Sequence, residues 1–284
     1  MQTSSIPKEQ ELLELIGLDV GFSLRRSSSG VAHLRGNELS VGRANATFES
    51  RLALMHRAPN AAVSAIDAPV LRERNDDSRP CERVFTFGEF QRRCKPGLSH
   101  VRGTGQQLRQ AGYESACQLR TLTSDVPLHT PFPRVLAPLN LIEAFPNAFL
   151  GVMLPNECFQ AMPRLRRGSK FDWLYGRCCE LKIFENLIAG VNRQLEALLS
   201  VIRTNWNHDE RAALVCLLTA AAVFEGRYTA VGDQSGGYFF LPPWQCWAPW
   251  ARDELNLQRT RLESIEVWVD GKRFSLHEAL PNGT

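Results

Sequence analysis

Three short apolar runs along the chain each end in a carboxylate. They are residues 15–21 with Asp19, residues 62–69 with Asp67, and residues 139–146 with Glu143. Apolar runs of this length, bounded by glycine or proline, are typical of buried strands. The pattern therefore predicts three strands that carry acids at their ends.

The segments after the first run predict an antiparallel meander. A second apolar run lies at 31–34, and a third short one at 38–41 follows the pair Gly36 and Asn37. Asn-Gly and Gly-Asn pairs between apolar runs are signals for a hairpin turn. We therefore expect the first three strands to pair in chain order.

A helix is expected between this meander and the strand that ends in Asp67. Residues 48–55 carry apolar side chains at helical spacing and stop before Pro59. A strand, helix, strand sequence normally makes a right-handed parallel crossover, which brings both strand ends to one edge of the sheet. Asp67 is therefore expected to lie near Asp19.

The remainder of the chain alternates between charged segments and helical patterns. Residues 71–104 are charged, contain Gly and Pro and lack clear periodicity, which predicts a long functional loop. A short helix is expected at 106–111, with a stop at Gly112. Residues 171–203 keep an apolar stripe that predicts one or two helices, and 211–225 are so apolar that a buried helix is expected. Late strands are expected at 228–231, 238–241 and 265–269.

Together these elements predict one α/β domain. It covers residues 12–284, carries a long loop insertion at about 71–104, and follows an N-terminal extension at 1–11. The 284 residues contain 44% hydrophobic and 22% charged residues, as expected for a globular protein. The sequence shows neither a run of about 20 apolar residues nor a charged-then-apolar signal pattern, so we expect a cytoplasmic protein with no membrane partner.

Cysteine spacing and overall charge add little about function. The eight cysteines include no C-x-x-C pair, and reduced, mostly buried thiols are therefore expected. The net charge of +3 is too small to indicate nucleic acid by itself. Residues 71–120, however, hold ten Arg or Lys against six Asp or Glu, and 164–170 hold four cations. Such runs are solvated loops or contacts to a phosphate backbone.

Four acids stand out by position. They are Asp19, Asp67 and Glu143 at strand ends, and Asp209 at the start of the buried helix. Each has a structural alternative, since Asp closes turns and Glu143 could be the exposed member of an alternating strand. For Asp209, Asn207 and Glu210 form a capping pattern, and an acid in the first turn complements the helix dipole. Convergence of several acids on one edge costs stability unless cations bind there.

The ordered motifs resemble a known family. They are GLDVG at 17–21, AIDAP at 65–69, IEAFP at 142–146 and HDERAA at 208–213. In order and spacing they resemble a family of predicted RNase H-like nucleases, catalogued mainly as a domain of unknown function within the RuvC and RNase H-like superfamily. The resemblance covers about residues 16–243, including 79–83, 96–99 and the turn at 236–238 before Pro242.

The resemblance implies a fold and a chemistry. It implies a five-stranded mixed sheet flanked by helices, here with additional C-terminal strands, and acids that hold divalent metal against a phosphodiester. Asp19 would be the first-strand metal ligand, Asp67 and Asp209 its partners, and Glu143 a further catalytic acid. Carboxylate oxygens suit Mg²⁺ or Mn²⁺. The residues expected to bind nucleic acid are Arg25, Arg26, Arg83, Arg166, Arg167 and Lys170.

Other interpretations remain open. His208 is a proton relay or, more simply, surface, and the aromatic residues Trp244, Trp247 and Trp250 stack bases or, as we expect, pack a C-terminal flap. An ATP-dependent phosphotransferase of the actin and sugar-kinase type would also use a first loop like 17–21. Such proteins need a second phosphate loop and an adenosine segment, which are not legible here. A non-catalytic nucleic-acid or partner-binding protein with the same fold is the third alternative.

Overall fold

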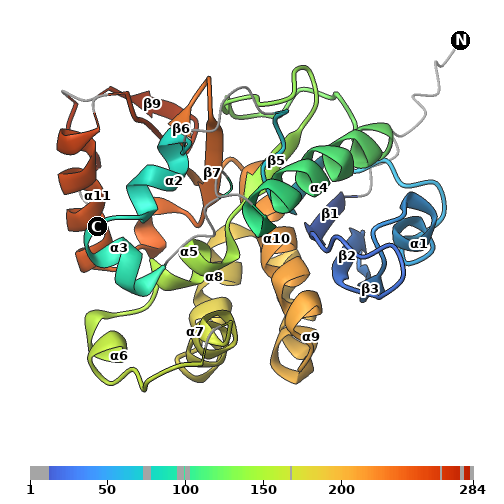
Figure 1. Cartoon of the computed structure of the whole chain (residues 1–284), viewed down its shortest axis with the longest axis horizontal. Helices are drawn as coiled ribbons and strands as arrows, with labels where there is room; N and C mark the ends of the chain where they lie inside the picture. The colour runs from blue at the N-terminus through green and yellow to red at the C-terminus, as the bar shows by residue number, and fades with distance from the viewer. Residues whose placement is uncertain are drawn as a thin grey trace, which may run out of the picture.

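The computed structural model describes residues 13–72, 78–94, 99, 103–166, 168–262, 264–275 and 278–281. Its strands are β1 (Glu14–Asp19), β2 (Ser29–Arg35), β3 (Glu38–Ala44), β4 (Val63–Asp67), β5 (Leu141–Ala144), β6 (Thr229–Asp233), β7 (Gly237–Leu241), β8 (Glu266–Val269) and β9 (Lys272–Phe274). They form one mixed sheet in the order β3-β2-β1-β4-β5-β7-β6-β8-β9. In Figure 1, the early strands lie on the right and the late strands on the left.

Helices surround this sheet. They are α1 (Phe48–Leu52), α2 (Pro80–Phe85), α3 (Gly88–Arg93), α4 (Thr104–Leu119), α5 (Pro146–Gly151), α6 (Asn156–Gln160), α7 (Lys170–Glu180), α8 (Ile183–Val191), α9 (Leu198–Thr204), α10 (His208–Phe224) and α11 (Pro249–Arg261), with 3₁₀ turns η1 (Arg120–Leu122), η2 (Arg193–Ala197) and η3 (Trp244–Cys246). The mixed α/β class expected from the sequence is therefore confirmed.

Strand pairing agrees with the predicted meander and crossover. Strand β2 pairs antiparallel with both β1 and β3. Strands β1, β4 and β5 run parallel, and β4 lies between the other two. The prediction that the strands of Asp19 and Asp67 are adjacent and parallel is confirmed.

The two faces of the early strands are covered by different helices. Helix α10 packs across β1, β2 and β4 within the larger hydrophobic core. Its residues from Ala212 to Val223 are all buried, which explains why the sequence is apolar all around the helix. On the opposite face Leu18 and Ile66 join a second core with Ala116 and other residues of α4. The carboxyl ends of β1 and β4 thus lie between α10 and α4.

Four expectations about local structure need correction. The described part of 71–104 contains α2 and α3, so it is not one long loop. Residues 171–203 form three helices and a 3₁₀ turn, where one or two helices were expected. The late strands, with the unexpected β9, extend the same sheet to nine strands in the described chain, so a five-stranded sheet is not confirmed.

The fourth correction concerns Gly112, which does not end a helix. Helix α4 continues through it to Leu119. A Cβ at this position would lie 2.4 Å from the carbonyl oxygen of Pro69 and 2.6 Å from the Cβ of Ala68. Glycine is needed here because α4 packs directly on the segment after β4.

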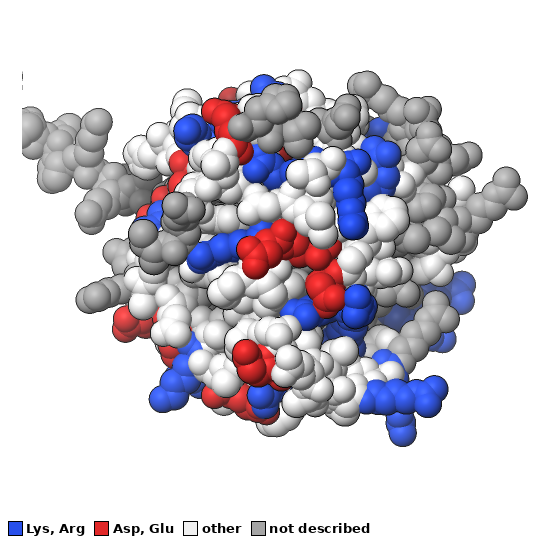
Figure 2. All heavy atoms as spheres, turned by 90° about the vertical axis from the view of Figure 1, so that its left-hand side faces the viewer, with Lys and Arg blue, Asp and Glu red and all other residues white. Residues whose placement is uncertain are grey.

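Burial and surface charge complete the picture. Cys81, Cys94, Cys158, Cys178 and Cys216 are buried, as expected. Figure 2 shows the face that is turned to the left in Figure 1, where basic and acidic side chains are interspersed. Among the described helices, none is long and apolar enough to cross a membrane.

Candidate functional site

The site begins where two buried strands reach the edge of the sheet. Asp19 and Asp67 are the last residues of β1 and β4 and are register partners. Side chains alternate between the two faces of a sheet, so register partners on parallel strands point to the same face. Because Leu18 and Ile66 face the α4 core, both aspartates face α10. The fold therefore sets two carboxylates side by side.

The start of α10 lies over the same position. Asp19 pairs with Gly30 on β2. A Cβ on Gly30 would lie only 1.9 Å from the carbonyl oxygen of Asp209, so this glycine permits the close approach of the helix. The helix begins here because the side chain of Asn207 accepts hydrogen bonds from the backbone N–H groups of Asp209 (3.0 Å) and Glu210 (3.2 Å).

The carboxyl group of Asp19 lies within reach of the charges of the other two aspartates. The pKa of Asp19 is raised well above its usual range by burial first, and then by the charges of Asp67 and Asp209. The pKa of Asp67 is raised to about 7, by burial and by the charge of Glu143. Both carboxyl groups are therefore held in an environment that disfavours their ionised forms and favours a bound cation.

Two arginines that the sequence analysis did not select contribute to this site. The Nε of Arg43 lies 2.9 Å from the Oδ2 of Asp209. The guanidinium of Arg51 is buried, donates to Ser29 Oγ (3.0 Å) and Ser115 Oγ (2.7 Å), and opposes the rise in the pKa of Asp19. A signal for Arg43 was present in the sequence, because the turn at Gly36 fixes the hairpin register that pairs Gly30 with Arg43.

Glu143 points away from the two aspartates, although its charge still acts on Asp67. It aligns with Ile66, one residue before Asp67, so its side chain points to the opposite face. Both of its oxygens accept hydrogen bonds from the guanidinium of Arg79, at 2.6 and 2.7 Å. This bidentate pair joins a buried glutamate to a partly buried arginine and links β5 to the start of α2. A catalytic role for Glu143 stays a prediction, and the geometry favours a structural ion pair.

The residues expected to bind nucleic acid are dispersed. Arg25 and Arg26 are exposed in the loop that follows Asp19. Arg83 lies on α2, and Lys170 begins α7 and donates to the carbonyl oxygen of Arg92. Arg166 is exposed, and Arg167 lies outside the described residues. Of this set, the two arginines of the β1–β2 loop are nearest in sequence to the acid pair.

His208 and the tryptophans already have structural partners. The Nδ1 of His208 lies 2.9 Å from the Oδ2 of Asp172 on α7. Trp244 and Trp247 are buried, and each indole N–H donates to a backbone carbonyl. Trp250 is partly buried and donates to the carbonyl oxygen of Leu154. The expectation that the tryptophans pack is confirmed.

The carboxylates of the site can be compared with the ligands that a divalent metal ion requires. Within the described ranges, no three His, Cys, Asp or Glu side chains form a group that could hold a metal ion. The nearest pair of donors is the aligned carboxylates of Asp19 and Asp67, while one oxygen of Asp209 is engaged by Arg43. Mg²⁺ is commonly bound by one or two carboxylates, with water and substrate phosphate completing its octahedron. Two adjacent carboxylates therefore fit Mg²⁺ or Mn²⁺ in a site that the substrate completes.

The packing of α10 over Gly30 gives a direct test of the site. We expect Gly30→Ala to destabilise the fold by about 1–3 kcal/mol, since a methyl group there overpacks the backbone at Asp209. The matched change Gly176→Ala lies within α7, where an added Cβ meets nothing within 4 Å, and should stabilise by about 0.5–1 kcal/mol. Urea unfolding of both variants measures the difference. Equal effects of the two changes would show that α10 does not press on Gly30.

Comparisons with known proteins add no assignment to this geometry. No protein-family model, curated protein or solved structure matches the chain. The features that bear on function are therefore those of the site itself: two aligned carboxylates at the ends of parallel strands, and a third acid at the start of the helix that covers them.

Proposed function

We propose that this chain is an RNase H-like, metal-dependent nuclease that hydrolyses phosphodiester bonds of nucleic acid. The observation that carries the proposal is the alignment of Asp19 with Asp67, on the face where α10 brings Asp209 close. Strands β1 to β5 also form a mixed five-stranded part of the larger sheet, with helices on both faces. This arrangement supports the resemblance in the sequence motifs.

Asp19 and Asp67 would hold the ion, which is Mg²⁺ or Mn²⁺. When bound, it would supply an activated water and offset the charge that develops on the leaving oxygen. Asp67, with a pKa raised to about 7, must lose its proton for the ion to bind, so binding should strengthen as the pH rises toward neutrality. Arg43 holds the Oδ2 of Asp209, so Asp209 would join the ligands through its other oxygen or by leaving this arginine.

The remaining residues of the site would act on the substrate. Arg43 is 40% exposed at its side chain, and on release from Asp209 its guanidinium could bind a phosphate oxygen. Arg25 and Arg26 lie in the loop that follows Asp19 and could bind the neighbouring phosphates. The buried guanidinium of Arg51 donates hydrogen bonds to serines of β2 and α4, and it would hold the β1–β2 loop in place.

A substrate panel tests the proposal. Purified protein is incubated with single-stranded, duplex, hybrid and branched nucleic acids in Mn²⁺, in Mg²⁺ and in EDTA, with ATP hydrolysis measured in parallel. We expect cleavage of at least one substrate with metal and none in EDTA. ATP hydrolysis without cleavage would favour the phosphotransferase alternative, and binding without cleavage in every metal condition would favour the non-catalytic alternative.

A further inference from the structure

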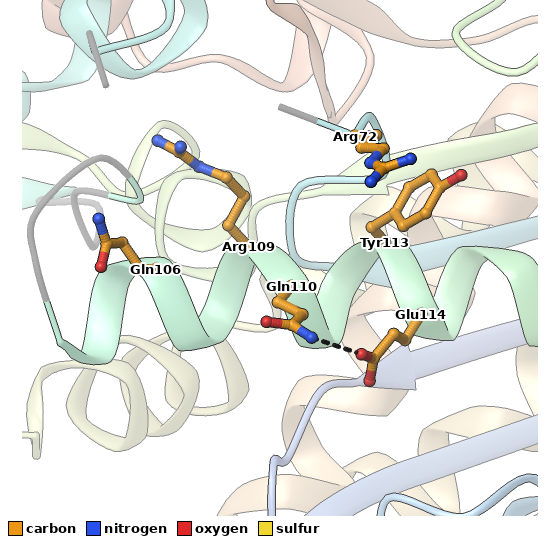
Figure 3. A pocket seen from close by; sticks show the side chains of 6 residues that line it. All are labelled: Arg72, Gln106, Arg109, Gln110, Tyr113 and Glu114. Carbon is orange, nitrogen blue, oxygen red and sulfur yellow. Dashed lines mark hydrogen bonds between the residues drawn. The ribbon is translucent and has the colours of Figure 1, made fainter. Parts of the chain in front are cut away.

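A polar pocket lies beside α4, on the other side of the sheet from the aspartates. Its volume is about 740 Å³, within the range of about 300–1,000 Å³ that is typical of small-ligand sites. It is lined by Arg72, Gln106, Arg109, Gln110, Tyr113 and Glu114. In Figure 3 the side chains of Arg109 and Tyr113 rise from one side of α4, and Arg72 approaches from the segment after β4. Of these residues only Glu114 bears on the acid site, since its charge acts on the guanidinium of Arg51.

The lining of this pocket follows the helical repeat. Five of its six residues lie on α4 at spacings of three and four, which places them on neighbouring faces of the helix. The apolar side of the same helix, with Ala116 and Leu119, packs in the second core. A helix that covers a sheet has one apolar side, and its other side is free to carry ligand-binding groups.

The charge of the pocket favours an anion. The lining holds two guanidinium groups, of Arg72 and Arg109, and one carboxylate, of Glu114, which points to the other side of α4 in Figure 3. The carboxylate already accepts a hydrogen bond from Gln110 Nε2 at 2.9 Å. Arg109 is only 5% exposed, which places a desolvated guanidinium in the pocket wall. Guanidinium groups bind phosphate through paired, charge-assisted hydrogen bonds.

The pocket also offers a surface for a ring. Tyr113 is half-buried, and its aromatic ring lines the same hollow as the guanidinium of Arg72. Any of the nucleic-acid bases can stack on an aromatic side chain, because every base has a π-face. The amide group of Gln106 can both donate to and accept from the edge of a base. Phosphate and base recognition are therefore available in one pocket.

The position of the pocket connects it to the acid pair. Arg72 follows Asp67 by five residues, a chain length that spans at most roughly 17 Å. Gly112 of α4 packs on Ala68 and Pro69, immediately after Asp67. The pocket thus lies near the carboxyl end of β4 on the α4 face, while the aspartates face α10. A nucleic-acid strand that crosses this edge of the sheet could reach both the pocket and the two aspartates.

We propose that the pocket binds a nucleotide, with its phosphate on Arg72 and Arg109 and its base on Tyr113. This inference rests on the proposed nuclease function, because the nucleotide is then one unit of the nucleic-acid strand that is cleaved at Asp19. A free nucleotide carries the same chemistry, and the experiment separates the two sources.

Binding is measured by fluorescence anisotropy with a labelled single-stranded DNA oligonucleotide, in EDTA and over a series of salt concentrations. Arg72→Ala should weaken binding and reduce the slope of log K against log salt by about 0.7, the value for one phosphate contact on a single strand. Tyr113→Ala should weaken binding about tenfold. Arg120→Ala is the matched control, an exposed arginine just beyond α4 and outside the pocket, and should leave the slope unchanged. Arg109 is left intact because it is buried.

Adenosine monophosphate is titrated into the same proteins by calorimetry. If the oligonucleotide binds and both pocket substitutions weaken its binding, the pocket holds a nucleic-acid strand. If only the monophosphate binds and the same substitutions weaken it, the pocket holds a free nucleotide. The proposal is overturned if wild type binds neither ligand, or if both pocket variants bind both ligands as wild type does. Cleavage by the wild type together with unaltered binding by the pocket variants would leave the nuclease function standing and remove the pocket from it.

Discussion

Replacing Asp19 with asparagine is expected to lower metal-dependent cleavage at least about a hundredfold. The carboxylate is one of two aligned donors at the edge of the sheet. A metal ion supplies several kcal/mol of transition-state stabilisation, and each 1.4 kcal/mol is a factor of ten in rate. Asparagine keeps the shape of the side chain and loses the charge that holds the ion. Initial rates with saturating Mn²⁺ give the comparison.

Asp253→Asn is the matched control for this experiment. It makes the same chemical change at an exposed position on α11, remote in sequence from the acid pair, and should leave the rate unchanged. Asp67→Asn should be as damaging as Asp19→Asn, and the double variant no worse than either, because the two carboxylates act as a unit. An Asp19→Asn variant that retains full metal-dependent activity would remove the acid pair from the mechanism.

Much of the fold around the acids could be predicted from the sequence because the signals there are local. The turn at Gly36 fixes the register of the meander, and α1 lies in the crossover that places Asp67 beside Asp19. The buried helix after Asn207 is recognisable because it is apolar on every side. Burial on both faces and a cap signal are properties of single segments, so one sequence shows them.

Other features could not be predicted from the sequence because they depend on tertiary contacts. Gly112 resembles a helix stop, but its role is to let α4 pack on Pro69, a contact between segments distant in sequence. In the sequence Glu143 resembles Asp19 and Asp67 because it also lies near the end of an apolar run. A register offset of one residue turns it to the opposite face, where Arg79 binds it. The pairing of Asp209 with Arg43 likewise depends on how α10 crosses the sheet.

The second large effect concerns stability, which should depend on pH through Asp67. The unfolded chain releases the proton of an aspartate near pH 3.9, whereas in the folded protein this pKa is raised to about 7. Between these values the folded state binds more protons than the unfolded state, so the free energy of unfolding falls as the pH rises from about 4 to about 7. Asp19 acts in the same direction, since its pKa is also raised.

We expect Asp67→Asn to remove this loss. In EDTA the free energy of unfolding of wild type, relative to the variant, should fall by about 2–4 kcal/mol between pH 4 and pH 8. Urea unfolding at several pH values measures the difference, and Asp253→Asn controls for the change of residue type. A plain turn aspartate predicts the reverse, a variant less stable by about 0.5–2 kcal/mol at neutral pH with no gain from removing the charge.

Divalent metal should then raise the stability of wild type relative to Asp67→Asn at pH 8. An ion that binds only the folded wild type stabilises it by about 2.7 kcal/mol at a hundred times its dissociation constant, whereas Asp67→Asn lacks one of the two aligned donors and should respond far less. Because the ion competes with the proton on Asp67, the stabilisation of wild type should shrink as the pH falls below about 7. Wild type that ignores Mn²⁺ at pH 8, together with a variant that is less stable at every pH, would show that Asp67 closes its strand as a structural residue and binds no metal.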